Sequence, residues 1–222
     1  MSRLAISVMV SIFLTFSLAS CGRDKEAEIH FNKGVEFQQG GQFGKGLIEY
    51  DKAISLNPDY AAAYYNRGST HEQMGQIQKA IEDFNEAIRL EPEDSTAFHK
   101  RGKLYLKLNQ PDKAIADFSF AIDLDPEFVM AWFNRGVANE MVDQAEPALK
   151  DFDQAILLDP EFAPGYVVRA MSRTRQANDQ QAQEDIIRAI ELGYPRDRLL
   201  NEVHRIKILR KDKSLQEFGG QE

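Results

Sequence analysis

The feature that most constrains this chain is a period of 34 residues. A small residue returns near the middle of the first half of each copy, at Gly34, Gly68, Gly102, Gly136 and Ala170. A proline returns near the end of the copy, at Pro58, Pro92, Pro126 and Pro160. A strict period of this length is typical of solenoids, in which one supersecondary unit is written several times and packs on its neighbours.

Within each copy the apolar pattern predicts two helices joined by a turn. Positions 4, 7, 8 and 11 of the copy lie on one face of a helix. Position 20 is glycine or alanine and position 27 is alanine in all five copies, so two helices can approach closely there. A large side chain at position 24 fills the space beside them. Gly41 and Gly75 stand where the first helix should end, and the prolines end the second one.

In this period, and in its small, aromatic and proline positions, the segment 27–196 resembles the tetratricopeptide (TPR) repeat. The resemblance implies an all-α fold, a right-handed superhelical solenoid of about five helix–turn–helix units. The units are expected over 27–60, 61–94, 95–128, 129–162 and 163–196. The fifth departs from the pattern, because Pro195 comes one residue late.

The segment 197–213 follows the repeats and is expected to form a capping helix. It places five apolar residues on one side, namely Leu199, Leu200, Val203, Ile206 and Leu209. Such a helix covers the open end of a solenoid. The alternative is a helix that binds a partner or a membrane surface. For 214–222 we expect a flexible tail.

A cation and a carboxylate return in step with the apolar pattern. The cation stands at position 7, as Lys33, Arg67, Arg101, Arg135 and Arg169. The carboxylate stands at position 23, as Glu49, Asp83, Asp117, Asp151 and Asp185. Both positions lie eight residues from the turn, about 12 Å along their helices, so they are level across the hairpin. We predict structural ion pairs, within a unit or with the neighbouring one. The alternative is an arginine row that reads an anionic ligand.

The N-terminus carries the pattern of an export signal. After Arg3, the run from Leu4 to Ala19 contains no charge and is about sixteen residues long, shorter than the ~20 that span a bilayer. Leu18-Ala19-Ser20-Cys21 then resembles the lipobox of bacterial lipoproteins. The resemblance implies a signal peptide over 1–20, cleavage before Cys21, lipid such as palmitate on Cys21, and a short linker over 21–26. An uncleaved signal anchor is the alternative.

Composition excludes several function classes. The formal net charge is -8, which argues against nucleic acid as a partner, because phosphate contacts need clustered cations. With one cysteine, no intramolecular disulfide can form. The histidines have no ligand spacing, and no nucleophile–base pair or phosphate loop is present. We therefore expect no metal, no cofactor and no enzymatic activity.

The first helix of a TPR unit faces a concave groove, and this resemblance places the partner-binding surface at positions 2, 5, 6, 9 and 13. The predicted groove residues are Tyr65, Asn66, Ser69, His99, Lys100, Lys103, Lys107, Met130, Phe133, Asn134, Val137 and Met141. The third copy is basic and the fourth apolar, and Val167, Val168 and Met171 extend the apolar stripe. We expect a peptide with acidic residues followed by hydrophobic ones. The alternatives are a solvated lysine face and packing against the fifth unit and the cap.

Together these features predict a membrane-anchored protein–protein interaction scaffold of the bacterial cell envelope. Gly22 stands where lipoproteins retained in the inner membrane often carry aspartate, which favours the outer membrane, facing the periplasm, if the organism has two. Resemblance at repeat level leaves pilus assembly, outer-membrane insertion and cell-wall remodelling open, and it leaves the oligomeric state open. The alternative function is a self-assembling structural protein of the envelope.

Overall fold

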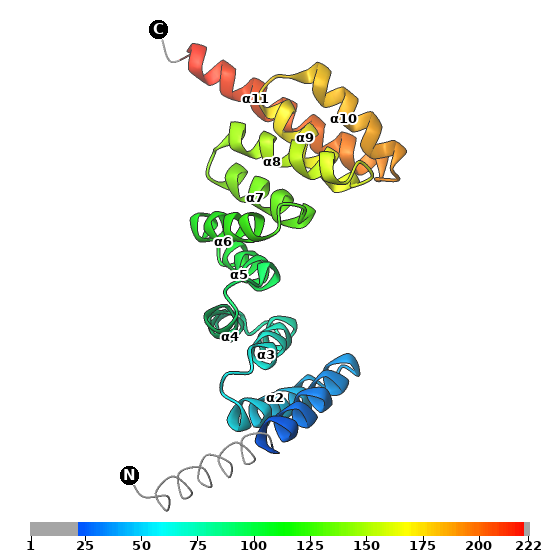
Figure 1. The fold of residues 1–222 in the computed structure, drawn as a ribbon. Coiled ribbons are helices and arrows are strands. Elements are labelled where there is room, and N and C mark those ends of the chain that lie inside the picture. The colour runs from blue at the N-terminus through cyan, green and yellow to red at the C-terminus, as the bar shows by residue number, and fades with distance from the viewer. Residues whose placement is uncertain (1–21, 220–222) are drawn as a thin grey trace, which may run out of the picture. The chain divides into compact units, whose positions relative to one another are not determined.

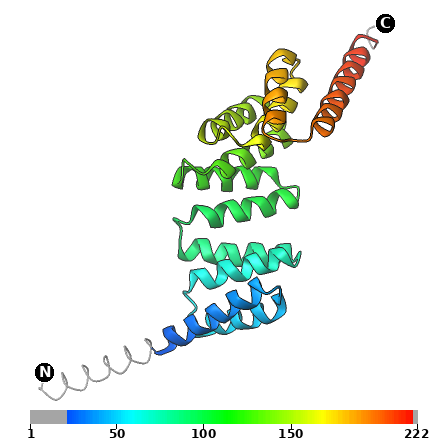
Figure 2. The ribbon, with the colours of Figure 1, turned by 90° about the vertical axis from the view of Figure 1, so that its right-hand side faces the viewer.

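A computed structural model describes residues 22–219, and the secondary structure of this part of the chain is helical throughout (Figures 1 and 2). A helix over 22–39 comes first. It is followed by α2 (Phe43–Leu56), α3 (Ala61–Gln73), α4 (Ile77–Leu90), α5 (Ser95–Lys107), α6 (Pro111–Leu124), α7 (Val129–Met141), α8 (Ala145–Leu158), α9 (Ala163–Arg175), α10 (Asp179–Glu191) and α11 (Arg196–Gly219). The predicted all-α class with paired helices is confirmed.

The helices form two compact units, which divide within α5. One unit ends at Arg101 and the other begins at Gly102. In both units, helices adjacent in sequence pack as pairs, α3 against α4 in the first, and α7 against α8 and α9 against α10 in the second.

Two segments differ from their expected boundaries. Residues 22–26, expected to be a linker, are helical, and Ala27 is already fully buried. At the other end α11 continues to Gly219, beyond the expected helix end at 213. The reason is local, since residues 214–218 contain neither glycine nor proline to stop a helix. The signal peptide over 1–20, Cys21 and residues 220–222 lie outside the described residues.

The turn between the two helices of a copy uses a left-handed residue at position 15. Gly41 and Gly75 take positive φ there, as expected for helix ends. The later copies put Asn109, Asp143 and Ala177 in the same conformation, with φ of 54°, 58° and 63°. The turn geometry is therefore kept after the glycine has been lost.

Each pair of helices closes on a large side chain at position 24. Tyr50, Phe84, Phe118 and Phe152 are completely buried, and Ile186 nearly so. The small residue at position 8 is needed because the ring lies on the backbone of the first helix. A Cβ added to Gly136 would stand 2.4 Å from Cε1 of Phe152, and one added to Gly34 would stand 2.5 Å from the Tyr50 ring.

The recurring arginine forms an ion pair with the recurring aspartate of the same copy. Nη2 of Arg67 lies 2.6 Å from Asp83, that of Arg135 lies 2.7 Å from Asp151, and that of Arg169 lies 2.6 Å from Asp185. In each case Nε donates a second hydrogen bond to the same carboxylate. The three aspartates are only 2–4% exposed. These are therefore bidentate pairs inside the fold, not surface pairs.

The same arginines also reach the preceding copy. Their Nη1 atoms donate to position 25 of that copy, from Arg67 to Asp51, from Arg101 to Asn85, from Arg135 to Ser119 and from Arg169 to Asp153. Each guanidinium also lies over the aromatic ring at position 4 of its own helix, at 4.8–5.6 Å from the ring centroid. The arginine side chain thus joins the two helices of its own copy to the preceding copy.

The electrostatics of Arg67 follow from this geometry. Burial disfavours the charged guanidinium, but the hydrogen bonds that Arg67 donates to Asp83 and Asp51 outweigh it and raise the pKa of Arg67 above its ordinary value. Position 25 varies in chemistry from copy to copy, so this second contact left no simple pattern in the sequence.

The first copy does not follow the pattern. Glu49 accepts hydrogen bonds from Nδ1 of His30 at 2.5 Å and from Nζ of Lys52 at 2.6 Å, whereas Lys33 is exposed. The Lys52 and His30 contacts hold the pKa of Glu49 below its ordinary value. The predicted Lys33–Glu49 pair is therefore replaced, because His30 and Lys52 engage the two carboxylate oxygens of Glu49. Arg101 and Asp117 belong to different units, and their pairing stays a prediction.

Removing one member of the Arg67–Asp83 pair should leave the other as a buried charge without its partner. Arg67→Ala and Asp83→Ala are each expected to lower the free energy of unfolding by about 3–5 kcal/mol, and the double variant by much less than the sum. Urea denaturation of the four proteins gives the coupling energy. Arg89→Ala is the matched control, because its pair with Glu86 is exposed and should contribute only about 0–1 kcal/mol. Additive losses at Arg67 and Asp83 would show that the pair contributes nothing as a pair.

Gly136→Ala should force the Phe152 ring out of place and cost about 1–3 kcal/mol of unfolding free energy. Adding Phe152→Ile should recover most of the loss, because Ala170 and Ile186 form this combination in the fifth copy. Gly44→Ala in α2 is the control. It meets no atom within 4 Å and should stabilise by up to about 1 kcal/mol. Gly136→Ala with unchanged stability would contradict the close approach.

Candidate functional site

The packing of the first helices decides which of their side chains remain available. Position 3 is turned toward the preceding copy, where Ala63, Ala97 and Ala131 are completely buried. Position 5 packs on the last residue of its own copy, since Phe31 packs on Tyr60 with ring centroids 5.0 Å apart and Phe133 on Phe162 at 5.1 Å. Positions 2, 6, 9 and 13 remain for the face between these two directions. We call this face the concave face.

Four of the predicted groove residues therefore lie in the packing between helices. Tyr65 packs edge-on against Phe84, with ring centroids 5.5 Å apart, and Phe133 also contacts Phe152. His99 and Ser69 are buried. Burial also raises the pKa of the Tyr65 hydroxyl. Sequence periodicity alone assigned position 5 to the groove, because periodicity does not show contacts with the second helix and the last residue of the same copy.

In the first unit, the concave face is lined by amides. A hollow of about 430 Å³ is bordered by Val35, Gln38, Gln39, Gly41, Phe43, Asn66 and Gln73. Gln38 accepts a hydrogen bond from the Tyr50 hydroxyl at 2.7 Å and donates to Gln73 at 3.4 Å. Asn66 donates to the carbonyl of Ala62. Each amide supplies both a donor and an acceptor, so this hollow suits a polar or main-chain ligand group.

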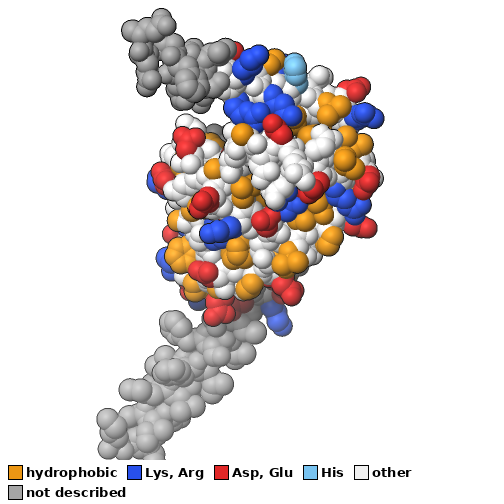
Figure 3. Space-filling view, turned by 90° about the horizontal axis from the view of Figure 1, so that it is seen from above, with side chains coloured by type: hydrophobic (Ala, Val, Ile, Leu, Met, Phe, Trp, Pro, Cys, Tyr) orange, Lys and Arg blue, Asp and Glu red, His pale blue; other side chains and the backbone are white. Residues whose placement is uncertain are grey.

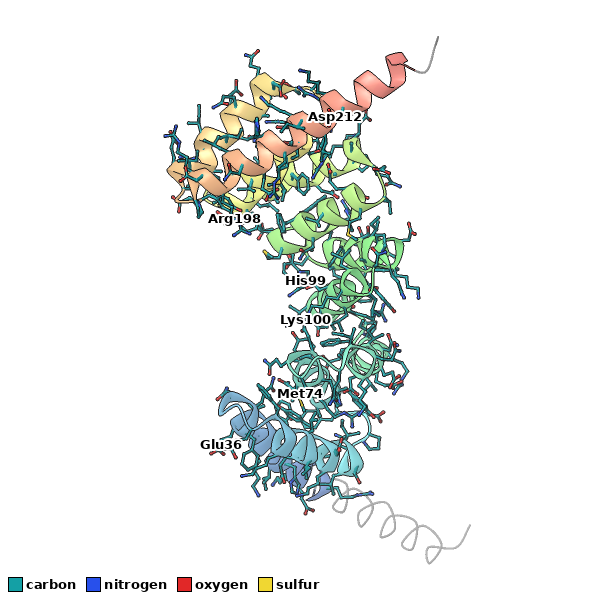
Figure 4. The ribbon with its side chains drawn as sticks, turned by 180° about the vertical axis from the view of Figure 1, so that it is seen from behind. Glu36, Met74, His99, Lys100, Arg198 and Asp212 are labelled. Atoms are coloured by element: carbon teal, nitrogen blue, oxygen red, sulfur yellow. The ribbon has the colours of Figure 1, made fainter. Side chains whose placement is uncertain are left out.

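The predicted basic residues lie on α5, where Figure 4 labels His99 and Lys100. Nζ of Lys100 lies 3.4 Å from Glu72, so part of its charge is already balanced within the first unit. Lys103 is half-buried and Lys107 is exposed, and both belong to the second unit. The cations that the second unit presents from α5 are therefore these two.

The second unit presents an apolar stripe. On α7, Met130 and Met141 are 38% and 45% exposed, and Asn134 and Val137 are half-buried between them. On α9, Val168 and Met171 are half-buried, whereas Val167 is only 5% exposed, in a cluster with Leu199 and Val203 of α11. The stripe thus consists of Met130, Val137, Met141, Val168 and Met171. Methionine adapts its shape to its partner and is common on surfaces that accept varied sequences.

A second line of contacts joins neighbouring first helices along the concave face. Position 12 of one copy meets position 13 of the next, as Gln38 meets Gln73 and as Glu140 meets Nη1 of Arg175 at 2.6 Å. The hydroxyl of Ser172 also hydrogen-bonds Glu140. Sequence analysis missed these residues, because an amide pair in one place and an ion pair in another share no residue type.

Position 11 supplies a further donor to the buried aspartate in two copies. Asn139 donates to Asp151 at 2.9 Å and Arg173 to Asp185 at 2.7 Å.

Within the described residues, no group of three His, Cys, Asp or Glu side chains is placed to hold a metal ion. Across 22–219, no helix combines the length and the apolar character needed to cross a membrane.

Comparison with known families identifies the repeat. Tetratricopeptide-repeat models match residues 61–94 and 95–128, and a second TPR repeat model matches residues 34–75. A search of curated proteins gave no match.

Three solved structures illustrate the shared architecture. YrrB, described as a TPR protein with an unusual peptide-binding site, is 24% identical over 84% of this chain and 96% of its own, with a TM-score of 0.71. PilF of Pseudomonas aeruginosa is 16% identical over 87% of this chain and 88% of its own, with a TM-score of 0.72. MamA of Desulfovibrio magneticus RS-1 is 20% identical over 75% of this chain and 94% of its own, with a TM-score of 0.71. At these identities the likeness is one of fold. Residues 34–128 therefore match tetratricopeptide-repeat models, and the same pairing of helices continues to α10.

Proposed function

We propose that this protein is a lipid-anchored scaffold of the bacterial cell envelope that binds a partner protein on the concave face of its first helices. The observation that carries the proposal is the exposed methionine stripe of the second unit. Met130 and Met141 are both more than a third exposed, and exposed apolar patches mark interaction sites. The likeness to YrrB, a protein described as having a peptide-binding site, supports the same class of function.

The chemistry of this face suggests which segment it binds. Lys103 and Lys107 on α5 precede Met130 and Met141 on α7 in the order of the copies. A peptide with acidic residues followed by apolar ones would place its carboxylates on the lysines and its apolar side chains on the methionines. The lysines steer association, and the methionines supply the buried area.

The anchor is proposed from the lipobox-like Leu18-Ala19-Ser20-Cys21. Several acyl chains at one site hold a protein stably on a membrane, because each buried CH₂ contributes about 0.8 kcal/mol. Residues 22–26 are helical, so they span about 7.5 Å, at 1.5 Å per residue, between the lipidated cysteine and the first repeat. The first unit would therefore work close to the membrane surface. Gly22 favours the outer membrane, facing the periplasm.

Cys21→Ser tests the anchor directly. In cells fed labelled palmitate, the wild-type chain should carry the label and sediment with membranes, and the variant should lose the label. If the wild type carries no label and the variant still sediments with membranes, the apolar segment before Cys21 is an uncleaved signal anchor. Ser11→Thr, which lies outside Leu18–Cys21 and leaves the thiol in place, controls for general effects on export.

Crosslinking in intact envelopes followed by purification of the full chain tests the scaffold. Lys103→Glu combined with Met141→Gln should reduce the captured partner by roughly tenfold, because both the charge and the apolar contact are lost. Leu157→Gln is the matched control, since this side chain of α8 is 72% exposed and lies outside the concave face. Unchanged capture by the double variant would refute the proposed surface, and capture of this chain alone would favour self-assembly.

A further inference from the structure

The second copy lacks an aromatic ring that other copies place on position 5. In the first copy, the Phe31 ring packs on Tyr60, with centroids 5.0 Å apart, and in the fourth copy Phe133 packs on Phe162 at 5.1 Å. Tyr60 and Phe162 both stand at position 34, the last residue of the copy. The second copy has Asp94 there instead. A short, charged side chain therefore stands at the position that supplies this ring in the other two copies.

A hollow of about 230 Å³ lies beside the position-5 ring of this copy. That ring belongs to Tyr65, which still packs edge-on against Phe84, with centroids 5.5 Å apart. The ring is therefore held from one side and borders the hollow on another. Apolar walls are supplied by Ala61, Ala62 and Ala87. The hollow can thus accept an apolar stem as well as the polar group at its end.

The hollow opens onto the concave face of the first unit. Its lining includes Asn66 at position 6, and Ala62 and Thr96 at position 2 of their copies. The fourth copy carries the larger Met130 at position 2, so the small residues here help to keep the hollow open. Asn66 also borders the amide-lined hollow described above. The two hollows therefore share a wall.

The charge in the hollow is of one sign. Its charged lining residues are Glu91 and Asp94, both carboxylates. Three hydrogen bonds from the start of α5 all end on Oδ1 of Asp94, so Oδ2 can still accept. Burial raises the pKa of the Tyr65 hydroxyl, and the carboxylates of Asp94 and Glu72 raise it further. On the face that Figure 3 shows, by contrast, acidic and basic side chains are interspersed.

We propose that this hollow is a binding site for an arginine side chain of a partner protein. The aliphatic stem packs on the alanines, and the guanidinium lies on the Tyr65 ring and donates to the two carboxylates. The protein uses the same combination internally, since Arg67 lies 5.5 Å from the centroid of the Tyr64 ring and pairs with Asp83. Lysine fits less well, because an ammonium lacks the planar fork of donors.

This inference rests on the proposed scaffold function and deepens it. The second unit is expected to take acidic and apolar residues, whereas the first unit takes an arginine. The amides beyond Asn66 can hydrogen-bond the main chain on one side of that arginine, because each supplies both a donor and an acceptor. The two units then select different segments of a partner.

Fluorescence polarisation with the full-length protein in detergent tests the site. One labelled peptide of alanine and serine carries a single central arginine, and a second carries citrulline, which has nearly the same shape without the charge. The wild type should bind the arginine peptide roughly tenfold more tightly, because citrulline cannot form the charge-assisted hydrogen bonds. A lysine peptide should bind with intermediate affinity.

Two variants remove the site in different ways. Glu91→Gln with Asp94→Asn abolishes both charges and keeps the shapes, and asparagine can still cap α5. This double variant should lose the preference for arginine over citrulline. Asp94→Phe supplies the ring that other copies have at position 34 and fills the hollow, so it should also lose the preference. Circular dichroism establishes that both proteins remain folded.

The matched control is Glu82→Gln with Glu86→Gln, which makes the same change in net charge on α4, outside the lining of the hollow. It should keep the preference for arginine. Equal binding of the arginine and citrulline peptides to the wild type would overturn the inference. So would a preference that survives Glu91→Gln with Asp94→Asn, or one that is lost in the control as well. The scaffold function is decided separately, by envelope crosslinking with the Lys103→Glu and Met141→Gln variant.

Discussion

A guanidinium with partners on three sides connects one repeat to the next. In Arg67, Arg135 and Arg169 it pairs with a buried aspartate of the second helix, lies on an aromatic ring of its own helix and donates to the preceding copy. A charge can remain in the fold only because each of its donors is directed to an acceptor. The geometry of the pair also fixes the rotation of the first helix about its axis. That rotation decides which residues pack and which face outward.

Once the rotation is fixed, the remaining face is free to vary. Position 3 is buried, position 5 packs within its own copy, and positions 8 and 11 contact the second helix of the same copy. The concave positions differ more from copy to copy, and they change from amides in the first unit to methionines in the second. Specificity can therefore change without loss of the fold. The same division explains why a charged residue can recur on a face that is otherwise buried.

Much of the fold could be predicted from the sequence, because the residues needed for helix packing and for the turns recur every 34 residues. The small residue at position 8, the large one at position 24 and the left-handed turn at Gly41 and Gly75 follow from the spacing alone. The turn residues Asn109, Asp143 and Ala177 were not predicted, because the structure keeps the conformation without the glycine. The Glu140–Arg175 and Gln38–Gln73 contacts were missed because they conserve a position and not a chemistry. Periodicity also could not separate position 5, which packs within its own copy, from the true concave positions.

The central claim is that the repeated residues build the protein and the variable concave ones bind its partner. Site-specific photocrosslinking in living cells tests it most directly, with a photoreactive amino acid placed in turn at Met130, Met141, Val137, Leu157 and Ile187. The first three lie on the concave face, and the last two are exposed side chains of second helices. The account predicts crosslinks to one partner from the concave positions and none from Leu157 or Ile187. Equal crosslinking from both sets, or crosslinking from the second helices alone, would contradict it.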